Sequence, residues 1–338
     1  MALRTFDQAT IDSTGAFLIQ QLELLDRTIH EPLQSFTWSR DINVRTDVTM
    51  AHDFSSFTNQ ALGSVGGIDP TSKAFISKNT SDLPNVAIDI GKTASPLIPW
   101  GMTVDFTIFE LESAQLLGQG IDEQKMSALR RKHQQDLDIM VYLGDTTIPN
   151  AKGMFNSTQI PTANSLTAAT AGASSPTGNT TSTKFSDKAP ATILTDVNTL
   201  LNQVWAASGY TRCPRDLILS PLAFSYLAST LVSTAGNVSI LQFLKDNSIA
   251  LSENGVPLNI VSSKWLTGTN NSNTLGVNAT DSMYAYTKEY DLIRYPLVPI
   301  MGLPVQFRGA AQIRPYIAKF GVVEFVYPEC VGTMAGIA

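Results

Sequence analysis

The chain has 338 residues, of which 43% are hydrophobic and only 15% are charged, and its formal net charge is −6. This length allows two or three sub-domains, and the small number of charges suits a protein with large buried interfaces better than a monomer. The acidic balance and the absence of a long Lys/Arg run argue against a basic segment that neutralises nucleic acid.

Cysteine content and hydropathy point to a protein of the cytoplasm. Cys213 and Cys330 are the only cysteines, which is too few for a disulfide framework, although a single bridge between them stays open. The N-terminal residues lack the apolar core of a signal peptide, and no segment approaches ~18 uncharged apolar residues. We therefore expect neither secretion by that route nor a membrane span.

Residues 1–43 predict an arm that contains one amphipathic helix. Apolar side chains recur there at helical spacing, at Leu18, Leu22, Leu25 and Ile29. Pro32 ends the pattern. The apolar stripe must dock on something, either the body of its own chain or a neighbouring subunit.

Residues 44–99 have a β-like pattern and predict an extended hairpin loop. Alternating apolar residues indicate half-buried strands, first at Val86, Ile88 and Ile90, and then at Val104, Phe106 and Ile108. The segment between Gly63 and Pro84 is polar and glycine-rich. A long hairpin with so few apolar residues at its tip needs an external surface to become ordered.

The most informative segment is a long helix predicted over Ile121–Gly144. It contains no internal Pro or Gly, so its about 24 residues would span roughly 36 Å. One apolar stripe, formed by Met126, Leu129 and His133, marks its N-terminal half. Ile139–Leu143 is apolar all round, and we expect this end to be buried. The helix resembles a strut that is anchored at one end.

The next segment, 157–189, consists almost entirely of Thr, Ala, Ser, Asn, Gly and Pro, which favours an exposed loop. An α/β sub-domain follows. Its first helix has apolar residues on one face, at Leu194, Val197, Leu201 and Val204. A buried strand, 217–219, leads through Ser220 and Pro221 into another helix, and the chain is β-rich from residue 282 onwards.

No catalytic, metal or cofactor site is predicted. The three histidines, His30, His52 and His133, are far apart and have no partners at ligand spacing. The Gly-x-Gly at Gly118 lacks the remaining features of a dinucleotide or phosphate loop, and Ser220 lacks a nucleophile-elbow motif.

Asp136 and Asp138 are the candidate charged site of the long helix. They lie in its C-terminal half, where the helix dipole disfavours carboxylates. They point about 160 to 200° apart around the helix axis, so they cannot act as a paired acid and base. Each is expected either to be solvated or to meet a cation on another element or subunit.

The order of these segments resembles the major capsid proteins of tailed bacteriophages, of the Hong Kong 97 type. The resemblance covers most of the chain and rests on five segments: the helical arm at 15–30, the extended loop before PLIPWGMTVDFTIFELESAQ, the spine-like helix with GDTTIPNAKGMFN, the RDLILSPLAFSYL segment, and the closing segment from YDLIRYPLVPIMGLPVQFRG to FGVVEFV. None of these is a catalytic signature.

The resemblance implies an α+β fold with four parts. These are an N-terminal arm (1–43), an extended β-hairpin loop (44–99), a peripheral domain with the spine helix (100–189 and 301–338, including the loop 157–189), and an α/β axial domain (190–300). It also implies a structural protein of the virion that self-assembles into hexamers and pentamers of an icosahedral DNA-filled shell. Arms and extended loops would lap over neighbouring subunits, with Leu18, Leu22, Leu25, Ile29, Asp136 and Asp138 as candidate assembly contacts.

The resemblance further implies partners of the shell, namely portal and decoration proteins and a scaffold, with assembly in the host cytoplasm. Because the arm begins directly at Met1, we expect the scaffold to be a separate protein. Lys73, Lys78 and Lys92 lie in the loop region, but no matching Asn is identifiable, so we expect no covalent cross-link between subunits. A ladder above 36.5 kDa on boiled denaturing gels would contradict this.

Two other functions stay open at this point. One is an encapsulin-like compartment, whose shell holds a cargo enzyme in place of DNA. The other is an α/β enzyme with an unrecognised site. The size of the assembled particle and its nucleic-acid content distinguish these possibilities.

Overall fold

The computed structural model describes residues 34–64, 75–76, 78–79, 86–117, 121–233, 236–269 and 278–337. The chain divides into a first unit, 1–35, and a second unit, 36–338. The arm helix with Leu18, Leu22, Leu25 and Ile29, the Gly-x-Gly at Gly118, and His30 lie outside the described residues. The account below concerns the second unit.

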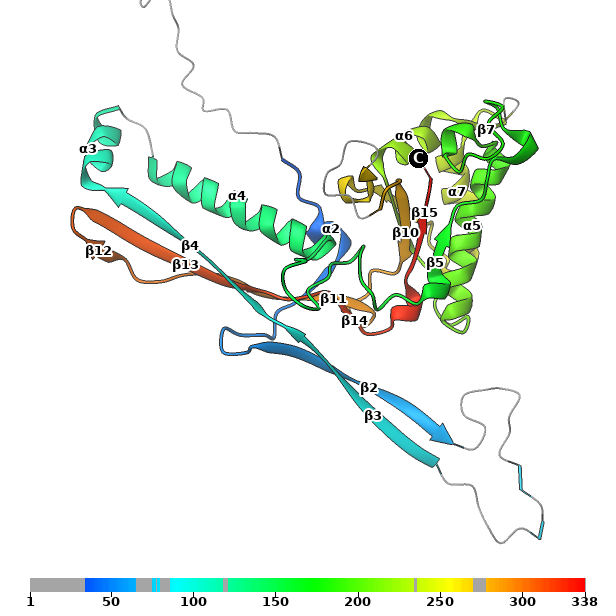
Figure 1. The fold of residues 1–338 in the computed structure, drawn as a ribbon, viewed down its shortest axis with the longest axis horizontal. Coiled ribbons are helices and arrows are strands. Elements are labelled where there is room, and N and C mark those ends of the chain that lie inside the picture. The colour runs from blue at the N-terminus through cyan, green and yellow to red at the C-terminus, as the bar shows by residue number, and fades with distance from the viewer. Residues whose placement is uncertain are drawn as a thin grey trace, which may run out of the picture. The chain divides into compact units, whose positions relative to one another are not determined.

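A six-stranded sheet forms one half of this unit (Figure 1). Its strands run in the order β1 (Asn43–Arg45), β11 (Ile293–Gly302), β13 (Ala311–Phe320) and β12 (Gln306–Arg308), while β4 (Ile98–Thr107) pairs with β13 and β14 (Glu324–Phe325) pairs with β11. β4 and β13 are antiparallel along their whole length, from Ile98 opposite Phe320 to Thr107 opposite Ala311.

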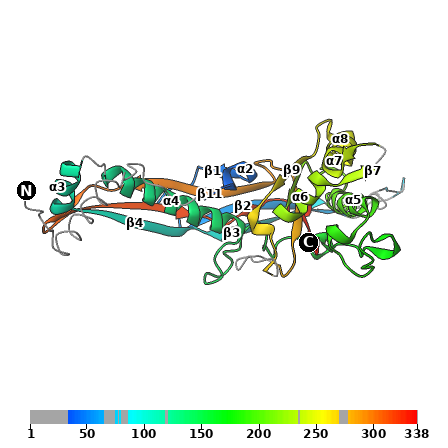
Figure 2. The same cartoon turned by 90° about the horizontal axis from the view of Figure 1, so that it is seen from above.

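The predicted long helix is confirmed as α4 (Ile121–Tyr142). It runs alongside β4 and β13 in both views (Figures 1 and 2). Its apolar stripe meets the sheet, where Leu129 packs with Val104 and Tyr316. His133 is buried between the rings of Trp100 and Phe320, at centroid distances of 4.9 and 5.2 Å.

One predicted strand ends earlier than expected. β4 stops at Thr107, and Ile108 begins a helix, α3 (Ile108–Leu117). Glu110 accepts a hydrogen bond from the backbone N–H of Thr107, and the Thr107 hydroxyl accepts one from the N–H of Glu110. This reciprocal capping starts the helix, and it leaves Ile108 47% exposed instead of on the buried face of a strand.

The segment after α4 folds back onto the end of that helix. Gly144, at φ 70°, reverses the chain, and the N–H groups of Met154 and Phe155 donate to the carbonyls of Val141 and Tyr142 at 2.7 and 3.1 Å. The Asn156 side chain donates to the carbonyl of Leu143 at 2.7 Å. The last carbonyls of a helix have no partner within the helix, so this return turn supplies what α4 lacks.

A five-stranded sheet forms the other half, in the order β5 (Ser165–Thr167), β15 (Gly332–Ala335), β10 (Ser282–Tyr286), β6 (Asp216–Leu219) and β9 (Asn259–Ser262). The helices of this half are α5 (Pro190–Ala207), α6 (Pro221–Ser229), α7 (Ile240–Asn247) and α8 (Ile249–Asn254). A small pair, β7 (Leu231–Ser233) and β8 (Val238–Ser239), lies beside them (Figure 1).

The sequence signals of this half are confirmed. The predicted face of α5 is buried at Val197, Leu201 and Val204, and Leu194 packs against the same core. Ser220 caps α6 by accepting from the N–H of Ala223. Strand β10 is buried on both faces, since Met283 and Ala285 join the core under α5 while Tyr284 and Tyr286 join a second core that contains the end of α4.

The predicted hairpin consists of β2 (Phe54–Ser64) and β3 (Val86–Pro96), which pair in register with each other. Its strands are not half buried as expected. Ile88 and Ile90 are 57% and 68% exposed, because β2 and β3 form a separate two-stranded sheet that no helix covers within the described part of the chain.

The segment 157–189 is also more ordered than its composition predicts. It forms β5 and three short 3₁₀ helices, η1 (Thr162–Asn164), η2 (Gly172–Ser174) and η3 (Phe185–Asp187). Phe185 is buried in the core under α5, and the buried Lys188 ammonium pairs with Asp196 of α5. A few buried side chains are therefore enough to order this polar segment, because the neighbouring helix and strand supply the apolar surface.

Two further 3₁₀ turns, η4 (Lys264–Leu266) and η6 (Pro328–Cys330), follow β9 and precede β15. Cys213 and Cys330 are both buried as free thiols, so the disulfide left open by the sequence is absent. Among the described residues, no helix is long and apolar enough to cross a membrane.

Candidate functional site

In the part of the chain that the structure describes, no three His, Cys, Asp or Glu side chains gather into a group that could hold a metal ion. Ser220 serves as a helix cap, and His52 binds the backbone N–H of Thr49. Burial raises the pKa of the Cys213 and Cys330 thiols, which disfavours the reactive thiolate.

The densest polar cluster surrounds α2 (Trp38–Asp41), a single helical turn at the start of the second unit. On one side it contacts α4. The Asp138 carboxylate accepts from the backbone N–H groups of Thr37 and Trp38 at 3.0 and 3.2 Å. The Trp38 indole donates to Gln134 at 2.8 Å, and the buried Tyr142 hydroxyl donates to Asp41. Side chains from three successive turns of α4 therefore form hydrogen bonds with the single turn of α2.

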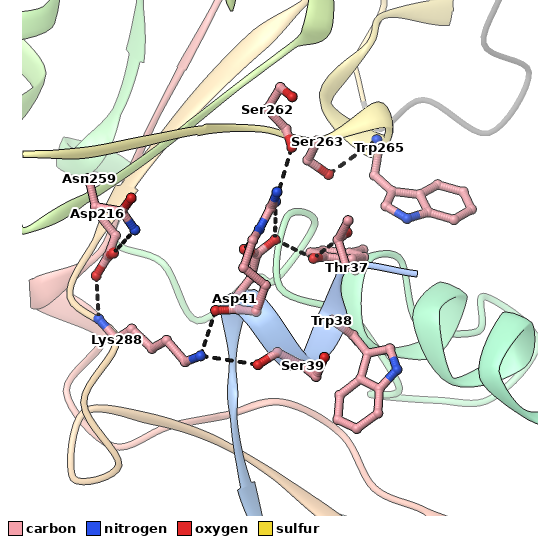
Figure 3. Close-up of polar contacts among 12 residues, drawn as sticks. Thr37, Trp38, Ser39, Asp41, Asp216, Asn259, Ser262, Ser263, Trp265 and Lys288 are labelled. Atoms are coloured by element: carbon pink, nitrogen blue, oxygen red, sulfur yellow. Dashed lines mark hydrogen bonds and ion pairs between the residues drawn. The ribbon is translucent and has the colours of Figure 1, made fainter. Parts of the chain in front are cut away.

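On its other side, α2 contacts the five-stranded sheet (Figure 3). Arg40 donates to the carbonyl of Ser262, at the end of β9, at 3.0 Å. Lys288, just after β10, donates to the carbonyls of Ser39 and Arg40 at 3.1 and 2.5 Å. The Tyr286 hydroxyl donates to the carbonyl of Asp41 at 2.7 Å. We call residues 37–41 with these partners the α2 junction, since it joins α4 to the five-stranded sheet.

The carboxylates of the α2 junction, Asp41 and Asp138, are buried and paired with cations that are partly exposed. Asp41 is 2% exposed and binds the Arg40 guanidinium. Burial, and after it the nearby Asp41 carboxylate, raises the pKa of Tyr142 far above its usual value. Tyr142 therefore stays a neutral hydrogen-bond donor to Asp41.

The two predicted carboxylates of α4 have different surroundings. Asp138 is 1% exposed, and in addition to the two N–H groups it accepts from the Trp265 indole at 2.8 Å and faces the Lys264 ammonium at 3.5 Å. The Lys264 ammonium is a cation on another element, which is one of the surroundings expected for Asp138. A role of Asp138 as an assembly contact stays a prediction. Asp136 binds Lys132 and the Trp100 indole, at 2.6 and 3.0 Å, and is partly exposed.

The hairpin is the second feature of interest, because one of its faces is apolar and exposed within the described part of the chain. Residues two apart on a strand share a face, and so do directly opposed residues. Ile88 and Ile90 therefore share a face with Pro96, which lies opposite Phe54. Phe54 is 66% exposed, so one face of the hairpin presents at least three large apolar side chains to its surroundings.

Sequence reasoning identified the hairpin and Asp138 but missed the α2 junction. Residues 38–41 form a short WSRD segment without periodicity, and their partners outside the segment lie between 96 and 249 residues further along the chain. A tryptophan followed closely by an acidic residue, within the last residues of the predicted arm (1–43), was the one local signal of an anchored segment.

Comparisons with known proteins agree with one another. A family described as "Major capsid protein" matches residues 73–337. The structure is similar to the capsid of Myoviridae Phage XM1, with a TM-score of 0.70 and 12% identity over 94% of this chain and 98% of that one. The capsid of the native GTA particle matches with a TM-score of 0.60 and 11% identity over 100% of both chains.

A structure of Microbacterium phage Oxtober96 matches with a TM-score of 0.58 and 11% identity, over 95% of this chain and 98% of that one. No curated protein sequence matches the chain. At these identities the structural likeness establishes a shared fold, while the family match extends over most of the sequence.

Proposed function

Because the chain belongs to the major capsid protein family and is a phage head-shell protein, we propose that it assembles as hexamers and pentamers into an icosahedral shell around a double-stranded DNA genome. The observation that carries this proposal is the family match over 73–337, which includes the spine helix α4, the five-stranded sheet, the six-stranded sheet except β1, and the second strand of the hairpin. The shared fold with phage capsids confirms the expected α+β capsid fold and is consistent with the Hong Kong 97 type.

The four-part division of the chain remains our proposal, with the boundaries 1–43, 44–99, 100–189 with 301–338, and 190–300. Two separate hydrophobic cores support a peripheral and an axial domain, one core under α5 and the other around the end of α4. β5 and β15 pair within the sheet of the proposed axial domain, so we assign these two strands to that sheet although they lie outside 190–300.

We further propose that the apolar face of the hairpin docks on a neighbouring subunit. An isolated two-stranded hairpin is marginally stable in water, and Phe54, Ile88 and Ile90 stay exposed among the residues that the structure describes. Spread over several neighbours, such contacts would bury more than the ~1,600 Å² of a standard interface in each subunit.

The proposed docking predicts that Ile90→Asp blocks shell formation without unfolding the subunit, because Ile90 is already 68% exposed. Asn59→Asp is the matched control: it places the same charge on the opposite face of the hairpin, since Asn59 lies opposite Gly91. We expect shells from the control only. Equal assembly of the two variants, judged by negative-stain electron microscopy, would refute docking through this face.

The composition fits a passive container. A mildly acidic wall, at a net charge of −6, would not trap the DNA inside, so filling would depend on packaging through a portal. We propose a separate scaffold, a portal and decoration proteins as partners, and assembly in the host cytoplasm. Under this proposal the protein is structural and not an enzyme.

Negative-stain electron microscopy of the purified protein tests the proposal directly. We expect hexamers, pentamers or closed shells, whereas a small closed oligomer would contradict a shell protein. Nuclease-protected DNA in particles isolated from infected cells would distinguish a genome container from an encapsulin-like compartment, for which neither the family nor the structural comparisons give support.

A further inference from the structure

A buried carboxylate sits where the hairpin leaves the six-stranded sheet. Glu324 of β14 is 1% exposed and accepts hydrogen bonds from three elements. Arg294 of β11 donates through Nε at 2.7 Å, and Arg45 of β1 donates through Nη1 at 3.3 Å. The third donor is the hydroxyl of Ser55 in β2, itself only 2% exposed.

Both arginines also reach the first residues of β2. Arg45 contacts the Ser55 hydroxyl at 3.1 Å and the carbonyl of Ser56 at 3.2 Å, and its other edge pairs with Asp47. The Arg294 guanidinium lies over the ring of Phe57, at 5.9 Å from its centroid. Three consecutive hairpin residues are thus bound by one group of charges, which we call the Glu324 cluster: Arg45, Asp47, Ser55, Arg294 and Glu324.

The charges of the Glu324 cluster balance, with two guanidinium groups and two carboxylates. A buried carboxylate is tolerated only when its oxygens are fully satisfied, and the forked donors of arginine then fix the geometry closely. An apolar contact would hold the same segment with less directional precision, because dispersion contacts are not directional. The cluster therefore specifies the angle at which β2 departs from the sheet.

Small errors in that angle are amplified along the hairpin. β2 has 11 residues, and at ~3.3 Å per residue it is roughly 36 Å long. A tilt of about 10° at its base would move the far end by roughly 6 Å, which exceeds the spacing of ~4.8 Å between neighbouring strands. A hairpin displaced by this amount would miss its proposed contacts with a neighbouring subunit.

We propose that Glu324 is the positioning residue of the hairpin, and that through Ser55 and Arg45 it sets the direction in which the apolar face meets a neighbouring copy of the chain. This inference rests on the proposed function, since it specifies how the assembly surface is aimed. Glu324 itself is buried within its own subunit.

Hydrogen–deuterium exchange on the unassembled full-length protein tests the positioning role. Ser55→Ala removes the hairpin's hydroxyl link without leaving a charge unpaired, and Glu324→Gln removes the charge itself. We expect exchange of the amides in the first half of β2 and the last half of β3 to accelerate at least fivefold in both variants, with α5 and β10 unchanged. The yield of closed shells should fall in parallel.

Asp53→Asn is the matched control. It removes an ion pair with Lys319 at the same end of the hairpin, but Asp53 is 82% exposed, so its loss should change neither exchange nor shell yield. Wild-type exchange and shell yield in Ser55→Ala would overturn the proposal, even if Glu324→Gln fails to fold. If the wild type itself forms no shells, the proposed function fails, while accelerated hairpin exchange in the variants would still support the positioning role.

Discussion

At the scale of single residues, buried polar groups do the most specific structural tasks in this protein. Asp138 lies near the C-terminal end of α4, where the dipole of its own helix disfavours a carboxylate. The structure supplies the compensation, because Asp138 caps the N-terminus of another helix, α2, whose own N-cap residue Thr37 makes no side-chain cap bond. The unfavourable position in one helix is offset by donors from two other segments.

Asp138→Asn should lower the free energy of unfolding by about 1–3 kcal/mol, because an amide group would face the donors that the carboxylate now satisfies. Asp136→Asn is the control on the same helix. Its partly exposed ion pair with Lys132 should contribute ~1 kcal/mol or less. Urea unfolding of the unassembled protein measures both, and equal losses would contradict the distinction between the two carboxylates.

His133 predicts a pH dependence of stability. Burial lowers its pKa below the ordinary value of 6.5, although the charge of Asp136 opposes this shift. The unfolded chain therefore takes up a proton at a higher pH than the folded chain does. The stability from neutral His133 is fully present above about pH 6.5 and is lost as the pH falls below that value.

His133→Phe should flatten the loss of stability below about pH 6.5, because phenylalanine keeps the ring contacts with Trp100 and Phe320 but does not titrate. Thermal unfolding at several pH values provides the measurement. A profile for His133→Phe as steep as that of the wild type would show that other groups control it.

At the scale of elements, the spine helix and its return turn form one unit. The turn satisfies the last carbonyls of α4, and it approaches so closely that Gly153 has no room for a side chain. A Cβ atom at Gly153 would lie 2.3 Å from the carbonyl carbon of Tyr142, well below any allowed contact. This close approach explains why glycine stands in the GMFN segment that ends the turn.

Gly153→Ala should destabilise the protein by about 3 kcal/mol or more, since backbone must move to accept the methyl group. Gly178→Ala is the comparison. Gly178 also requires a positive φ, 78°, but has open space around it, so alanine should cost only about 1–2 kcal/mol there. Urea unfolding of the two variants tests the difference, and similar losses would exclude close packing as the cause.

At the scale of the whole molecule, many large apolar side chains of the described residues are exposed to solvent. Exposed large apolar side chains occur on the hairpin and also around the β12 end of the six-stranded sheet, at Phe109, Val305 and Phe307. A monomer with only 15% charged residues would be poorly protected against association. For a subunit of a capsid shell, association through such apolar surfaces is the function of the protein.

The arm provides a prediction at this scale. Leu22→Asp would place a charge in the apolar stripe of Leu18, Leu22, Leu25 and Ile29, and we expect it to impair assembly more than folding of the subunit. Circular dichroism of the subunit and electron microscopy of the assembled product measure the two effects. An unfolded subunit, instead of a folded one that fails to assemble, would refute an assembly role for the arm.

The sequence by itself determined the elements whose signals are local. The absence of Pro and Gly from Ile121 to Tyr142 specified α4, and the Ser220–Pro221 pair marked the start of α6, since helix period and capping involve residues only a few positions apart. The order of these segments was also sufficient for the family resemblance, because that order does not depend on how the segments pack.

Only the tertiary structure decided which polar groups meet. Ser55 and Glu324 are 269 residues apart, Thr37 and Asp138 are 101 apart, and no local pattern brings such partners together. The same reason explains the errors over Ile90, which alternates like a buried residue but has no covering layer, and over 157–189, whose polar composition conceals the anchors Phe185 and Lys188. Whether a residue is buried depends on the residues that pack around it, and these come together only in the folded chain.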